Sequence, residues 1–95
     1  MWITIATPPF TDITLFDTIA EAVGPVDGML TRHVGTAEDG RLRVVVLWES
    51  REHAERFLVE QLGPALARVL GPEPAGRPEA LGINVERTFC AQAVG

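Results

Sequence analysis

The run from Val44 to Trp48 restricts the architecture of this chain more than any other segment. It is entirely apolar and rich in β-branched residues, which predicts a strand at the centre of a sheet. Alternate side chains of a strand point to opposite faces, so Val45 and Leu47 lie on the face opposite to Val46. Both faces of the sheet must therefore be covered at this point.

A first amphipathic helix is predicted between the first two strands. Apolar residues recur at helical spacing from Leu15 to Val23, and Gly24-Pro25 provides a stop signal. Thr14 and Asp17 stand in the positions of a capping box, so we expect the helix to begin at Thr14.

A second, longer helix is predicted after Ser50, which is a good N-cap residue. One face stays apolar as far as Val69, apart from Gln61. Gly63-Pro64 interrupts the helix without changing the phase of that face. This predicts a kink, or a restart with Pro64 in a first turn.

Three further segments have strand character: Trp2 to Ala6, Met29 to Gly35 and Ile83 to Phe89. Glu38-Asp39-Gly40 supplies turn residues between the second of these and the central strand, which predicts a hairpin. The Pro- and Gly-rich stretch from Gly71 to Gly82 is expected to be a long loop.

The resulting order is strand, helix, strand, strand, helix, strand. This order predicts an α+β fold, a ferredoxin-like βαββαβ domain with a four-stranded antiparallel sheet and two helices on one face. The length of the chain favours a single domain over residues 1–95.

The face of the sheet opposite the helices is expected to meet a second copy of the chain. If Ile3 and Ile5 face the helices, the residues between them belong to the other face. A hairpin register that pairs Met29 with Trp48 extends this open face along the neighbouring strand. Its apolar character favours a homodimer that encloses a cavity between two sheets. The residues assigned to this face are Trp2, Thr4, Ala6, Met29, Thr31, His33 and Trp48.

Composition excludes several classes of function. The formal net charge is -5, and arginines are spread singly, which disfavours binding to nucleic acid or to anionic membranes. Cys90 is the one cysteine, so no intrachain disulfide is expected. The first residues do not resemble a signal peptide, and no apolar run is long enough to cross a membrane. We therefore expect a cytoplasmic protein.

Three segments carry a resemblance to a known superfamily: Gly28 to Gly35, Leu42 to Ser50, and the helix with Phe57 and Leu62-Gly63-Pro64-Ala65-Leu66. They resemble the small dimeric α/β-barrel proteins. This superfamily includes antibiotic biosynthesis monooxygenases, polyketide cyclases, stress-responsive barrel proteins and short actinobacterial proteins of unknown function. The resemblance is strongest for the last group and covers roughly Trp2 to Leu70.

The resemblance implies a homodimer with a small hydrophobic or aromatic ligand. It also implies a cofactor-independent monooxygenase or a cyclase acting on an aromatic or polyketide-like substrate. In the monooxygenase branch a tryptophan at the end of this strand lies beside the substrate cavity, which matches Trp48. Related short proteins often carry a polar residue two positions earlier, where this chain has Val46.

His33 is the candidate catalytic base, because an imidazole in a partly dry cavity can accept a proton near neutral pH. The alternative is a histidine at an edge strand or dimer seam. The candidate substrate-binding residues are aromatic walls, an adaptable thioether and polar groups that steady an oxyanion. They are Trp48, Trp2, Thr31, Arg32, Met29 and Thr4.

No cofactor or metal is expected. Glu49 and His53 have the spacing of two ligands on one helix face, but no third ligand is evident. Two other functions remain open. A non-catalytic ligand-binding or stress-responsive barrel is consistent with an apolar cavity that lacks an acid–base pair. Haem binding rests on the two histidines and the superfamily.

Overall fold

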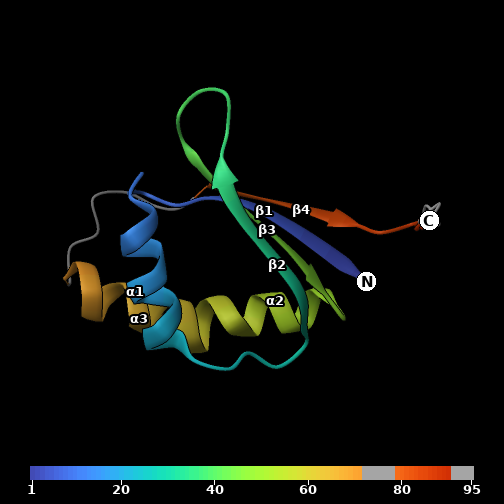
Figure 1. The fold of residues 1–95 in the computed structure, drawn as a ribbon. Helices are drawn as coiled ribbons and strands as arrows, with labels where there is room; N and C mark the ends of the chain where they lie inside the picture. The colour runs from blue at the N-terminus through green and yellow to red at the C-terminus, as the bar shows by residue number, and fades with distance from the viewer. Residues whose placement is uncertain (72–78, 91–95) are drawn as a thin grey trace, which may run out of the picture.

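The computed structural model describes residues 1–71 and 79–90. Within these residues, a four-stranded antiparallel sheet carries its helices on one face (Figure 1). The predicted ferredoxin-like βαββαβ order is confirmed, and the second helix is divided into three segments. The elements are β1 (Trp2–Thr7), α1 (Ile13–Val23), β2 (Met29–Thr36), β3 (Leu42–Trp48), α2 (Arg51–Phe57), η1 (Leu58–Leu62), α3 (Gly63–Leu70) and β4 (Glu79–Asn84).

The strands lie in the order β2-β3-β1-β4. β4 begins and ends earlier than predicted, because it follows the length of its neighbour β1. Asn84 pairs with Trp2. Beyond this pair, Val85 N–H donates to the Met1 carbonyl at 3.1 Å. Residues 72–78 of the expected loop lie outside the described residues, but its last residues, through Gly82, belong to the strand.

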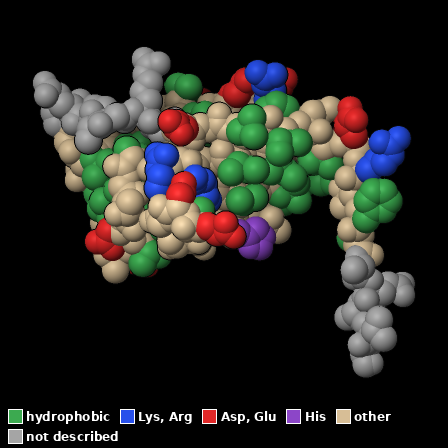
Figure 2. All heavy atoms as spheres, turned by 90° about the horizontal axis from the view of Figure 1, so that it is seen from above, with side chains coloured by type: hydrophobic (Ala, Val, Ile, Leu, Met, Phe, Trp, Pro, Cys, Tyr) green, Lys and Arg blue, Asp and Glu red, His purple; other side chains and the backbone are tan. Residues whose placement is uncertain are grey.

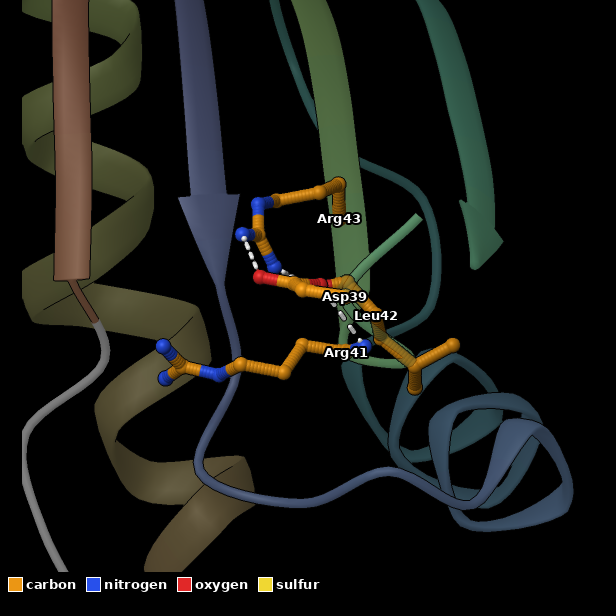
Figure 3. A network of polar contacts seen from close by, with 4 residues as sticks. All are labelled: Asp39, Arg41, Leu42 and Arg43. Carbon is orange, nitrogen blue, oxygen red and sulfur yellow. Dashed lines mark hydrogen bonds and ion pairs between the residues drawn. The ribbon is translucent and has the colours of Figure 1, made fainter. Parts of the chain in front are cut away.

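The β2–β3 hairpin has the predicted turn, and a polar network fastens it (Figure 3). Asp39 accepts a hydrogen bond from the Arg41 amide at 2.9 Å and pairs with the Arg43 guanidinium at 2.8 Å. These contacts stabilise the ionised carboxylate, so the pKa of Asp39 lies below its ordinary value of 3.8, with the Arg41 amide as the larger cause. Gly40 completes the turn at φ 82°, a conformation that favours glycine.

Helix α1 is capped two residues earlier than the sequence indicated. Asp12, rather than Thr14, is the N-cap, and its carboxylate accepts hydrogen bonds from the Thr14 hydroxyl at 2.7 Å and amide at 2.9 Å. Asp12 is the better N-cap residue here because its carboxylate accepts both hydrogen bonds at once. The same two bonds lower the pKa of Asp12. The predicted stop at Gly24 is confirmed.

Ser50 caps α2, as predicted, by accepting from the His53 amide. The expected interruption at Gly63-Pro64 takes the form of a π-helical turn, η1. Proline lacks an N–H, and its ring would collide with the carbonyl four residues earlier in an α-helix. The wider π turn relieves that collision, and Pro64 then occupies the first turn of α3.

The core lies between the sheet and the helices. Its buried centre consists of Val46, Trp48 and Ala54, and partly buried apolar residues pack around it. No helix within residues 1–71 and 79–90 covers the opposite face of the sheet (Figure 1). None of the helices in the described ranges is both long enough and apolar enough to span a membrane.

Candidate functional site

A cavity of about 120 Å³ lies between the sheet and the helices. Its lining is almost entirely apolar. The sheet contributes one wall through the alternate residues of β3 that face the helices, and aromatic side chains from α1 and α2 contribute the opposite wall. The residues most relevant to a ligand are Thr4, Phe16, Met29, Arg32, Val44, Val46, Trp48 and Phe57.

Trp48 forms the rigid part of this lining. The residue is 1% exposed, and its ring centre lies 5.2 Å from that of Phe57 in a tilted arrangement. The indole N–H donates to the Thr4 hydroxyl oxygen at 3.0 Å. This bond satisfies the buried indole and leaves the Thr4 hydroxyl proton available as a donor to a ligand.

Arg32 is the charged residue among the described residues that line the cavity. The residue is exposed, and its guanidinium carbon lies 5.6 Å from the centre of the Phe16 ring. This is the geometry of a cation–π contact. The guanidinium therefore lies at the mouth of the cavity, in contact with both water and the aromatic wall.

The predicted face assignment was wrong for β1. Thr4 and Ala6 line the cavity on the helix side, so Ile3 and Ile5 belong to the open face. Trp2 also packs against the core on the helix side. Both sets of residues are apolar enough to be buried, so alternation alone did not distinguish them.

The prediction placed Met29, Thr31, His33 and Trp48 together on the open face. The structure places Met29 and Trp48 on the helix side and leaves Thr31 and His33 on the open face. Met29 pairs with Trp48 as predicted, but a register shift between Met29 and Thr31 places Thr31 opposite Leu47. Because one extra residue reverses the facing of the residues that follow, His33 pairs with Val45 and leaves the face of Trp48.

The candidate residues are thus divided between two places. Trp48, Thr4, Met29 and Arg32 line one cavity. Thr31 shares the open face with His33, which lies in a shallow depression with Val45 and Arg43. His33 and Trp48 lie on opposite faces of the sheet, so the prediction that they share one site was wrong.

Trp2 is held by its own contacts. The Arg51 guanidinium carbon lies 5.0 Å from the centre of its ring. On the β4 side, a Cβ added at Gly82 would collide with the Trp2 indole. The glycine therefore allows the indole to approach the β4 backbone closely, which indicates a packing role for Trp2.

Phe16 and Phe57 are cavity residues that the sequence indicated only as helix core. Both residues belong to the apolar faces of their helices. The one feature of the sequence that could have indicated a cavity wall is that each of the two helices carries an aromatic residue on the face toward the sheet. The spacing along each helix does not distinguish a packed aromatic from a cavity wall.

His53 lies outside the cavity, at the start of α2. Its Nδ1 is 2.7 Å from the Ser50 hydroxyl, and its Nε2 is 3.7 Å from carboxylate oxygens of both Asp27 and Glu49. Gly28 has φ 79°, and a Cβ there would collide with the imidazole. His53 therefore packs on the turn that leads into β2. Within the described residues, no cluster of three or more His, Cys, Asp or Glu residues is arranged to hold a metal ion.

The architecture corresponds to a known class of fold. The chain has the ferredoxin-like fold of the antibiotic biosynthesis monooxygenases, which form dimeric α/β barrels. Seventeen chains of known structure match it. No protein-family model and no curated protein sequence matches the chain.

Two of these structures contain a bound small molecule, and a third is that of an oxygenase. A variant of MhuD with two manganese protoporphyrin IX bound per active site is 21% identical, with a TM-score of 0.67 over 96% of this chain and all of that one. A monooxygenase from the ActVA-Orf6 gene of Streptomyces coelicolor, in complex with nanaomycin D, is 20% identical, with a TM-score of 0.62 over 96% and 91%. SnoaB from Streptomyces nogalater, a cofactor-independent oxygenase, is 14% identical, with a TM-score of 0.60 over 93% of each chain.

The cavity does not fit a haem. Neither histidine lines it, and Met29 is the one residue of its lining, as described, with a soft donor atom. The fold similarity to MhuD therefore supports no haem chemistry for these residues.

Proposed function

We propose that this chain is a small-molecule enzyme that oxygenates an aromatic or polyketide-like substrate in the sheet–helix cavity without a cofactor. The observation that carries the proposal is an apolar cavity walled by Trp48, Phe16 and Phe57. Flat aromatic walls bind a flat substrate by stacking and exclude water from it. SnoaB and the ActVA-Orf6 protein, which share the fold, support oxygenation as the reaction class.

The reaction proposed is oxidation of an activated ring carbon by molecular oxygen. For a CH₂ group flanked by aromatic rings, one oxygen atom becomes the carbonyl oxygen of the product. The other leaves as water with the two hydrogens of that carbon. The substrate supplies all the electrons. Trp48 and Phe57 would position the ring, and the Thr4 hydroxyl would donate to the oxyanion that develops on it.

Cyclisation is less well supported. It requires a base that removes a proton from carbon, and the described lining holds no histidine or carboxylate. Oxygenation needs no such group when the substrate is itself readily ionised. The same lack favours the second candidate, a non-catalytic barrel that binds a ligand without converting it.

Oxygen uptake with anthrone and 1-naphthol distinguishes these two candidates. Their products would be anthraquinone and 1,4-naphthoquinone, each formed with one water per O₂ consumed. The enzyme should accelerate at least one of the two reactions above its rate in buffer. Val46→Trp, which fills the cavity, should abolish the acceleration, and Leu81→Trp on the open face should leave it unchanged. Saturable binding with uptake no faster than in buffer would instead support the non-catalytic barrel.

We further propose that a second copy of the chain covers the open face. Figure 2 shows hydrophobic side chains gathered on the face turned away from the helices. Leu81 is 60% exposed there, and Ile83 beside it is also exposed. A contiguous apolar face of this kind is rare on a monomer, and two-fold pairing is the simplest way to bury it.

A further inference from the structure

We propose that the cavity selects ligands with an anionic group on a flat aromatic body, and that Arg32 binds this group at the cavity mouth. This inference rests on the proposed function, since it concerns the same cavity, and adds to it the charge of the ligand. Three observations carry it: the bulge in β2, the surroundings of Arg32, and the chemistry of the rest of the lining.

The bulge in β2 is what turns Arg32 toward the cavity. After the register shift between Met29 and Thr31, Arg32 pairs with Val46, which faces the helices. With the regular register, the neighbouring residues would have that facing. Bulges re-aim side chains and are frequent beside binding sites. Without the bulge, Thr31 and His33 would face the helices; with it, the guanidinium of Arg32 does.

The guanidinium of Arg32 is ready to bind an anion. No ion pair joins it to a carboxylate anywhere in the described residues, whereas Arg43 and Arg51 each have an acidic partner. Its contact with the Phe16 ring restrains the side chain at the mouth. A restrained planar group loses less entropy when it binds a carboxylate with two parallel hydrogen bonds.

The other residues of the lining indicate what the rest of the ligand must be like. Thr4 offers one hydroxyl, and the rest of the described wall is apolar. The net charge of -5 repels an anion at long range, so recognition must come from direct contact with Arg32. A bicyclic aromatic carboxylate matches this arrangement, with its rings against Trp48 and its charge at the mouth.

A pair of probes with the same shape tests the inference. Calorimetric titration with 2-naphthoate and neutral 2-naphthamide at neutral pH should show about tenfold tighter binding of the naphthoate. Arg32→Gln should remove this preference while leaving the naphthamide affinity within about twofold. Arg32→Lys should restore part of it, because lysine keeps the charge but loses the planar fork.

Arg41→Gln is the matched control, because Arg41 lies on the exposed hairpin turn (Figure 3). It should keep the full preference. Equal binding of the two probes by the native protein, or a preference that survives Arg32→Gln, overturns the inference and leaves the proposed cavity intact. If neither probe binds, the cavity site and the inference fail together.

Discussion

The two faces of β3 present the same kind of side chain to very different surroundings. On one face, Val46 and Trp48 are buried beneath the helices and border a cavity. On the other, Val45 and Leu47 lie beside Ile3 and Ile5 on a face that the described part of the chain leaves open. Hydrophobicity alone therefore does not locate a ligand site. The closed face borders the proposed ligand site, with its aromatic walls and one guanidinium, and the open face is the proposed interaction surface.

The largest expected difference between the faces is in stability. Trp48→Ala should lower the free energy of unfolding by about 3–5 kcal/mol, because it removes a fully buried side chain and leaves a cavity. Leu81→Ala on the open face should change it by less than about 0.5 kcal/mol. Urea denaturation at concentrations where the chain is monomeric measures both. Equal losses would contradict the assignment of the core to the helix side.

Assembly should depend on the open face. Leu81→Asp combined with Ile83→Asp should weaken the proposed dimer by on the order of 100-fold or more, because two buried apolar contacts are lost and charge enters the interface. Val59→Asp is the control, since Val59 is equally apolar and 76% exposed on η1. Sedimentation equilibrium distinguishes the variants. A native chain that stays monomeric, or equal effects of both changes, would rule out the proposed interface.

A smaller effect separates two glycines on the opposite edge strands of the sheet, Gly82 on β4 and Gly35 on β2. Gly82→Ala should cost about 1–3 kcal/mol, because its Cβ would collide with the Trp2 indole. Gly35→Ala has no atom within 4 Å of the new Cβ and should be neutral or slightly stabilising. Thermal unfolding of the two variants provides the measurement. Comparable melting temperatures would show that Trp2 does not lie against β4.

The order of elements was predictable from the sequence because each element has its own local signal. Ser50 marks a helix start, and Asp39-Gly40 marks the hairpin turn. The exact ends of the helices and strands were harder to predict. β4 was expected from Ile83 onward because Pro and Gly precede it, but the strand starts at Glu79, where pairing with β1 begins. The extent of β1 determines where β4 begins and ends, and the sequence of the β4 segment does not contain the extent of its neighbour.

The site was predicted only in part, for two physical reasons. β1 is apolar on both faces, so its alternation does not show whether Ile3 or Thr4 faces the helices. The register shift in β2 then separated His33 from Met29 and Trp48, with which it had been expected to share a face. The pairing of Met29 with Trp48 was predicted correctly, because it precedes the bulge, but both residues lie on the helix side and not on the open face as expected. A bulge depends on tertiary pairing, and nothing in Met29-Leu30-Thr31 itself predicts one.

The most direct test of the central claim is the location of a bound aromatic ligand relative to the two faces of β3. Methyl NMR spectra recorded during titration with 2-naphthoate report on both faces of this one strand. The signals of Val44 and Val46 should shift, because both line the sheet–helix cavity. Those of Val45 and Leu47 should stay in place. Shifts confined to Val45 and Leu47 would place the site on the open face and contradict the account.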